Sequence, residues 1–300
     1  MKTTFCALTF LLISFLAQAQ EDALSVIVLK NGKEERVWIT AVSEKNIEYK
    51  INEVAVNRKR VAIADTESIY FYEPKSFSDA MDLFQSYDYT GAQTLFKEVR
   101  ESYKNLENLP GNYSTSAGYY EIECTRRKGD IPGMTALLKD YLSGALLRKD
   151  HKTQMELYPM WQAITKKEWP RLNNMTSGLL EEEGKWTKNQ LAQIYYGKGL
   201  SLEGAGETTQ ALNALNAAMT ADVSASAEVP KLALLACLRV LKADEGVQQA
   251  RKLFGTSDEK SSSNGHRLLL EGVALCKLWK SSMGSGRPLP EEFGEFFPAQ

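Results

Sequence analysis

Residues 195–218 read YYGKGLSLEGAGETTQALNALNAA, and this stretch sets the architecture expected for most of the chain. Its small and apolar residues recur three or four positions apart on both sides of a Gly206-Glu207 turn, which is the spacing of one helix face. We therefore expect two helices joined by a short turn. The residues that carry this pattern are Gly199, Leu202, Ala211, Leu215 and Ala218.

This hairpin resembles the tetratricopeptide repeat, a family in which helical hairpins stack into a superhelix. A small residue followed by a large one four positions later recurs at Ala92 and Phe96, and again at Ala250 and Phe254. The last two copies are separated by about 40 residues, which is longer than the 34-residue unit of the family. The resemblance implies a solenoid that binds a protein or peptide.

The apolar pattern stays helical from residue 75 nearly to the end of the chain. Turn and capping residues divide it into eleven expected helices, and so many helices in pairs favour a solenoid over a compact bundle. The expected helices span 76–86, 89–105, 114–128, 131–147, 151–165, 168–182, 187–204, 207–221, 227–242, 246–255 and 263–283.

The pattern from Leu24 to Tyr72 is that of β-strands. A β-branched run over 24–29 ends at Asn31-Gly32, the commonest hairpin signal, and five alternating runs follow, one of them around Val54 and Val56. Short strands at such spacing predict a small barrel or rolled sheet. The segments 28–32, 47–50 and 68–71 resemble a small Sm-like or SH3-like barrel of bacterial exported proteins. The expected fold is thus mainly α, an α-α superhelix with a small N-terminal all-β barrel-like module.

The first twenty residues have the pattern of a secretory signal. Lys2 precedes an apolar run from Phe5 to Leu16, and Ala17-Gln18-Ala19 fits the cleavage rule. A membrane anchor is the alternative, but the run is shorter than the ~20 residues that a bilayer span needs. We expect an exported bacterial protein, periplasmic or extracellular, cleaved after Ala19, with no transmembrane segment in the mature chain. The expected domains are a signal peptide (1–19), a β module (20–74), a helical array (75–283) and a Pro/Phe-rich tail (284–300).

Charge gives no general attraction to nucleic acid, since 36 Lys and Arg face 38 Asp and Glu in a chain of 300 residues. The basic cluster Asn57-Arg58-Lys59-Arg60 has no interleaved aromatic residues, so we interpret it as a solvated hairpin tip and expect no nucleic-acid partner.

Catalytic motifs are missing from the sequence. His151 and His266 share no motif partner, and no nucleophile elbow, phosphate loop or zinc motif occurs. We expect His151 to be exposed, and His266, at the start of the last helix, to be exposed or to take part in helix capping. We therefore expect no enzyme activity, no cofactor and no metal. Cys124, Cys237 and Cys276 are expected in the core, with a Cys237–Cys276 disulfide as the alternative.

The function expected from the sequence is that of a non-enzymatic scaffold or adaptor whose helical array binds a protein or peptide partner in the cell envelope. The alternative is a carbohydrate- or peptidoglycan-binding envelope protein that uses Tyr and Trp rings as stacking surfaces. Aromatic side chains are favoured binding anchors, although packing between helices is the other explanation for them. The candidate partner-binding residues are Tyr89, Tyr119, Tyr120, Tyr195, Tyr196 and Trp161.

Overall fold

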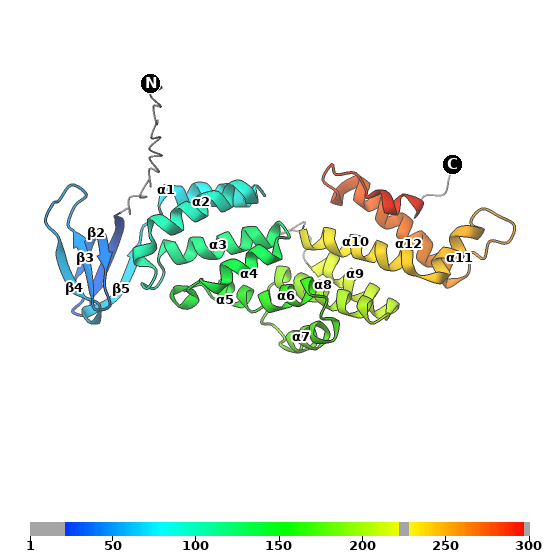
Figure 1. The fold of residues 1–300 in the computed structure, drawn as a ribbon, viewed down its shortest axis with the longest axis horizontal. Coiled ribbons are helices and arrows are strands. Elements are labelled where there is room, and N and C mark those ends of the chain that lie inside the picture. The colour runs from blue at the N-terminus through cyan, green and yellow to red at the C-terminus, as the bar shows by residue number, and fades with distance from the viewer. Residues whose placement is uncertain (1–21, 222–227, 297–300) are drawn as a thin grey trace, which may run out of the picture. The chain divides into compact units, whose positions relative to one another are not determined.

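The structure is a computed structural model that describes residues 22–221 and 228–296. Within these residues a five-stranded antiparallel sheet precedes twelve α-helices (Figure 1). The mainly helical fold with a small N-terminal β module is therefore confirmed. The expected signal peptide over 1–19 and the last four residues of the tail lie outside the described residues.

The sheet is open. Its strands are ordered β4-β3-β2-β1-β5, so β4 and β5 form its two edges instead of pairing to close the barrel-like module expected from the sequence. Strand β4 has only four residues, which limits the ladder that it can offer to a closing strand. The strands are β1 (Ala23–Leu29), β2 (Glu34–Val42), β3 (Asn46–Lys50), β4 (Lys59–Ala62) and β5 (Thr66–Phe71).

The run around Val54 and Val56, expected as a strand, belongs instead to the loop between β3 and β4. Asn52, Glu53 and Asn57 surround the two valines, and these residue types are depleted in strands. The inward-facing side chains of the neighbouring strands form the sheet's core without them. That core includes Ile27, Val37, Ile39 and Ile47, all almost fully buried.

The described chain divides into two compact units, which we describe separately. The first contains the described residues up to Lys128 together with Leu137–Leu147, and the second contains Gly129–Ala136 and the described residues from Arg148 onward. The division falls within the helices, and the sheet belongs to the first unit.

The first unit packs three helices beside the sheet. Asp88 and Asn112 cap two of them, because their side chains accept hydrogen bonds from the backbone N–H groups of Gly91 and Thr115. Asn105 ties this helical part to the sheet by donating a hydrogen bond to the carbonyl oxygen of Thr40 at 3.1 Å. The helices are α1 (Lys75–Gln85), α2 (Tyr89–Ser102) and α3 (Tyr113–Arg127).

The second unit is a succession of helices in which neighbours along the chain are neighbours in space. From α6 to α10 each helix packs on the next one, and α8 also packs on α6 and on α10. Contacts restricted to near neighbours are typical of stacked helical hairpins. Helix α4 (Ile131–Lys139) has residues in both units. The other helices are α5 (Lys149–Met155), α6 (Tyr158–Thr165), α7 (Trp169–Glu181), α8 (Lys188–Gly204), α9 (Thr208–Ala221), α10 (Glu228–Ala243), α11 (Glu245–Leu253) and α12 (Asn264–Leu278).

Two expected helices differ from the observed ones. The helix expected over 131–147 ends at Lys139, and a 3₁₀ turn follows at Ser143–Ala145. The helix expected over 151–165 is broken into α5 and α6. Pro159 explains this break, because it lacks a backbone N–H group and is tolerated in the first turn of α6 but not in the interior of a longer helix.

The C-terminal segment docks on its own last helices. Phe296 packs against Gly272 of α12 so closely that a Cβ atom there would lie 2.5 Å from its ring. Phe293 is also buried, and Glu295 forms ion pairs with Lys242 and Arg251.

Candidate functional site

The α8–α9 hairpin owes its close packing to a glycine. A Cβ atom on Gly199 would lie 2.5 Å from Cγ of Leu215 and 3.2 Å from its backbone nitrogen. No larger residue fits there unless the helices move apart. Ala211, Leu215 and Ala218 of α9 are fully buried. Ala92 and Phe96 of α2 are fully buried as well, whereas Phe254 is half-buried at the end of α11.

The six aromatic residues proposed from sequence as a partner surface lie mostly inside the protein. Tyr195 is half-buried, and the other five are each less than one tenth exposed. Five of the six rings contact aromatic neighbours. Tyr120 stacks on Phe96, and Tyr119 packs on Tyr120. Trp161 packs on Tyr196, and Tyr89 packs on Phe84. The structure therefore gives these side chains the packing role that was the alternative explanation.

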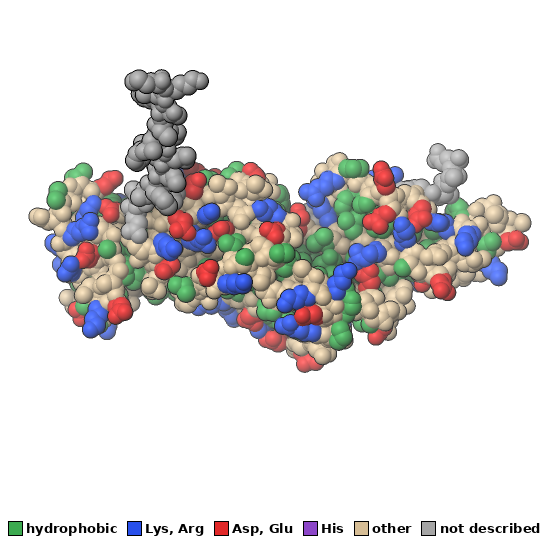
Figure 2. Space-filling model, in the orientation of Figure 1, with side chains coloured by type: hydrophobic (Ala, Val, Ile, Leu, Met, Phe, Trp, Pro, Cys, Tyr) green, Lys and Arg blue, Asp and Glu red, His purple; other side chains and the backbone are tan. Residues whose placement is uncertain are grey.

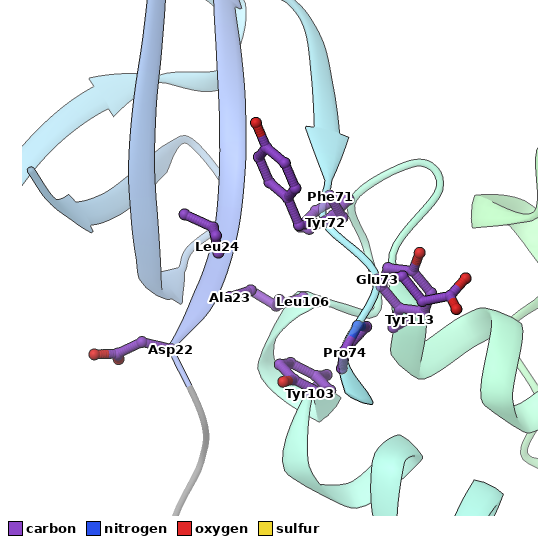
Figure 3. A pocket seen from close by; sticks show the side chains of 10 residues that line it. All are labelled: Asp22, Ala23, Leu24, Phe71, Tyr72, Glu73, Pro74, Tyr103, Leu106 and Tyr113. Atoms are coloured by element: carbon purple, nitrogen blue, oxygen red, sulfur yellow. The ribbon is translucent and has the colours of Figure 1, made fainter. Parts of the chain in front are cut away.

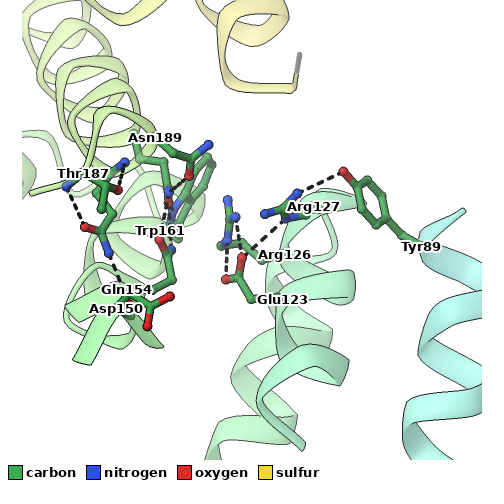
Figure 4. Close-up of polar contacts among 11 residues, drawn as sticks. Tyr89, Glu123, Arg126, Arg127, Asp150, Gln154, Trp161, Thr187 and Asn189 are labelled. Atoms are coloured by element: carbon green, nitrogen blue, oxygen red, sulfur yellow. Dashed lines mark hydrogen bonds and ion pairs between the residues drawn. The ribbon is translucent and has the colours of Figure 1, made fainter. Parts of the chain in front are cut away.

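Trp161 is held by a buried amide network in the second unit (Figure 4). Its indole N–H donates to Oε1 of Gln193 at 2.9 Å, and the same oxygen accepts from Gln154 at 3.0 Å. Nε2 of Gln193 donates to Gln154 at 3.0 Å and to Asn189 at 2.9 Å. The Gln193 amide thus makes all four hydrogen bonds available to it, which offsets its burial. Such a network positions α5, α6 and α8 against one another.

Helix α3 of the first unit carries buried charges (Figure 4). Arg126 donates two hydrogen bonds, at 2.8 and 2.7 Å, to the carboxylate of Glu123, and both side chains are buried. Arg127 reaches the hydroxyl of Tyr89 at 3.3 Å, and its guanidinium lies 4.5 Å from the ring centroid of Phe84. These groups stabilise one another inside the protein and are withdrawn from solvent.

Accessible aromatic side chains gather instead on one face of the sheet, which we call the aromatic face. Strand pairing places Leu24 between Trp38 and Tyr72, and places Val26 between Arg36 and Tyr70. Tyr70 is 63% exposed and Tyr72 is 49% exposed. The aromatic face consists of Leu24, Val26, Arg36, Trp38, Tyr70 and Tyr72.

Arg36 occupies the middle of the aromatic face. Its guanidinium lies 6.0 Å from the ring centroid of Trp38 and 5.3 Å from that of Tyr72, which are cation–π distances. Within the described residues no carboxylate lies within 4 Å of it. A guanidinium stacked on rings keeps its N–H donors directed outward, so this face offers both flat apolar surface and hydrogen-bond donors.

A pocket of about 140 Å³ adjoins the aromatic face and shares Leu24 and Tyr72 with it (Figure 3). The helical side of the pocket is formed by Tyr103, Leu106 and Tyr113. Burial, together with the nearby Glu73 carboxylate, raises the pKa of Tyr113 to about 12, so its hydroxyl stays protonated at neutral pH. The pocket is small and can take a side chain or a short ligand group.

Trp38, Tyr70 and Tyr72 were not among the surface residues expected from the sequence. The signal was present, since Val37 and Ile39 point inward and a strand must turn Trp38 the other way. In the same way, Tyr70 lies between Ile69 and Phe71 on its strand and points to the opposite face of the sheet from them. Because these strands carry apolar residues on both faces, the sequence pattern does not show which face is accessible.

The cysteine and histidine side chains are buried in the packed interior of the protein. Cys124, Cys237 and Cys276 are free and buried, and burial raises the pKa of the three thiols to about 12, 12 and 11. The Cys237–Cys276 disulfide is therefore not formed. His151 is buried, contrary to expectation. His266 is buried as well, and its backbone N–H donates to the capping hydroxyl of Ser263. Its ring stacks on Phe254 and lies 3.3 Å from Glu259.

The fold and site thus define a protein with an open aromatic-faced sheet and a run of helical hairpins. No known protein family, curated protein or solved structure gives a significant match to the chain. In the part of the chain that the structure describes, no helix is long and apolar enough to cross a membrane. Across residues 22–221 and 228–296, no three His, Cys, Asp or Glu side chains are grouped to hold a metal ion.

Proposed function

We propose that the chain is an exported scaffold that binds a protein or peptide partner in the cell envelope. The observation that carries the proposal is the aromatic face, where Trp38, Tyr72 and Arg36 are accessible together. Trp, Tyr and Arg are the residues that dominate the binding energy of protein interfaces. The packed sheet beneath them is formed before any partner arrives, so little ordering would oppose binding.

The helical hairpins supply the scaffold part of the proposal. Their near-neighbour packing and the close Gly199–Leu215 contact support the tetratricopeptide-like character inferred from the sequence. The strand-rich N-terminus supports the barrel-like resemblance only as an open sheet. The signal-like pattern of residues 1–19 supports export to the periplasm or beyond.

Affinity capture from envelope extracts tests the proposal. We expect the chain from Gln20 onward to retain a stoichiometric protein partner, and we expect Trp38→Ala with Tyr72→Ala to lower that retention at least tenfold. The matched control is Leu142→Ala, since Leu142 is also half exposed but lies outside the sheet. Equal retention by the aromatic-face variant and the control would remove the aromatic face from the proposal.

The second candidate function is binding of carbohydrate or peptidoglycan, which the same flat, exposed rings favour. Co-sedimentation with purified peptidoglycan separates the two functions. Sedimentation that needs Trp38 and Tyr72, without any retained protein partner, would replace the first proposal by the second. Release of soluble sugar or peptide fragments in the same assay would instead indicate an enzyme.

A further inference from the structure

The loop between β3 and β4 carries the most exposed large hydrophobic side chains in the described part of the chain. Val56 is 91% exposed, Val54 is 87% exposed and Ile51 is 52% exposed. Figure 2 shows hydrophobic side chains at the projecting end of the sheet. Strand formation would have buried part of these residues, but the loop conformation leaves them in water. Apolar groups so placed are stabilised only when something apolar covers them.

Cations surround the same tip. Residues 50–60 contain Lys50, Arg58, Lys59 and Arg60 but only one acid, Glu53, in a chain whose net charge is −2. Glu48 pairs with Arg58 at 3.7 Å and with Arg60 at 2.6 Å, although the two arginine side chains remain 55% and 73% exposed.

The remaining two cations differ in their partners. Lys50 pairs with Asp22 at 2.5 Å. Lys59 has no carboxylate within 4 Å among the described residues. The base of the loop is therefore positive while its tip is aliphatic.

We propose that this loop docks on an anionic phospholipid surface. Val54 and Val56 enter the boundary between headgroups and acyl chains, where aliphatic side chains leave water. Lys59, with Arg58 and Arg60, faces the lipid phosphates, which attract basic residues close to the membrane surface. The interaction is peripheral, because the loop is far too short to span a bilayer.

The aliphatic tip also distinguishes between lipid and nucleic acid as the source of the phosphate groups. RNA-binding surfaces pair their cations with aromatic rings that stack on bases, and the valines of this loop offer no such platform. Hydrocarbon is the environment that exposed valines favour. The basic cluster 57–60 is thus assigned to lipid and not to nucleic acid.

Vesicle co-sedimentation tests this docking. The probe is the chain from Gln20, which contains all described residues, mixed with vesicles of phosphatidylglycerol and phosphatidylcholine or of phosphatidylcholine alone. We expect sedimentation with the anionic vesicles, at least a tenfold weaker partition for the double variant Val54→Asp/Val56→Asp, and about a fivefold weaker one for Lys59→Gln. Leu142→Asp/Leu147→Asp is the matched control, since it places the same two charges on leucines that are 51% and 65% exposed elsewhere.

The proposal is overturned if the chain does not sediment with anionic vesicles, sediments equally with both vesicle types, or shows no loss in the double variant. Competition by millimolar inorganic phosphate would indicate a phosphate site instead of a membrane surface. Tighter binding to a single-stranded RNA oligonucleotide than to vesicles would also overturn it. Partner capture through Trp38 is unaffected by Val54→Asp/Val56→Asp if the two surfaces are separate, so failure of one proposal is distinguishable from failure of the other.

Discussion

Helices α3 and α8 are both buried around most of their circumference, but they are buried by different chemistry. Helix α8 removes side-chain volume, with Gly199 against Leu215, and satisfies its buried amides through Gln193. Helix α3 instead buries charged side chains, namely Glu121, Glu123 and Arg126. Packing by small residues fails when volume is added, whereas packing by charges fails when one partner is removed. Added side-chain volume should therefore destabilise α8, and loss of a charged partner should destabilise α3.

The largest expected effect is on α3. Arg126→Met removes the two hydrogen bonds that Arg126 donates to the buried carboxylate of Glu123, and breaking a buried pair typically costs about 3–5 kcal/mol. Urea unfolding followed by circular dichroism measures the change. The control is Arg171→Met, because Arg171 pairs with Glu168 at the surface and should cost no more than about 1 kcal/mol. Equal losses in both variants would show that burial adds nothing to the α3 pair.

The second effect is on α8. Gly199→Ala pushes a methyl group into Leu215 and should lower the free energy of unfolding by about 1–3 kcal/mol. Gly178→Ala is the matched control in α7, because no atom lies within 4 Å of a Cβ there, and it should stabilise the protein by about 0.5–1 kcal/mol. The same unfolding measurement applies. A stabilising Gly199→Ala would mean that the hairpin is looser than the structure has it.

The smallest effect is a pH dependence that only α3 should show. Burial raises the pKa of Glu121 above 4.5 even though Arg100 lies 3.0 Å away and opposes the shift. Protonated Glu121 therefore favours the folded state, and this stability is present below pH 4.5 and lost as pH rises through the folded-state pKa. Glu121→Gln keeps the neutral form at every pH.

The variant should thus be more stable than the wild type at pH 7, with the difference closing in acid. Unfolding curves at pH 4 and pH 7 measure it. Glu121→Gln that destabilises at pH 7 would mean that the Arg100 pair outweighs the burial of the carboxylate.

The same contrast explains what could be predicted from sequence. The α8–α9 hairpin was predictable because its small residues recur at fixed local spacing. Glu123 and Arg126, three positions apart, have the spacing of an ordinary solvated helix pair, so nothing local reveals that they are buried. Val54 and Val56 alternate as a strand would, but the polar residues around them disfavour a strand, and they lie in a loop without a pairing partner.

The candidate site was less predictable than the fold. The residues chosen from sequence were aromatic and numerous in the first helices, but apart from Tyr87 the most exposed aromatic rings are on the sheet. Accessibility depends on which face the rest of the chain covers, and that is a tertiary property. The break at Pro159, in contrast, was visible in the residue itself.

Binding at the aromatic face can be followed by the intrinsic fluorescence of Trp38. Of the five tryptophans, Trp38 lies on this face beside Arg36, whereas Trp161, Trp186 and Trp279 are buried and Trp169 packs over Gly204. A ligand that displaces water from the face would shift the fluorescence of Trp38 toward shorter wavelengths and leave the helical tryptophans nearly constant. Occupancy of the surface could therefore be followed in solution without any attached label.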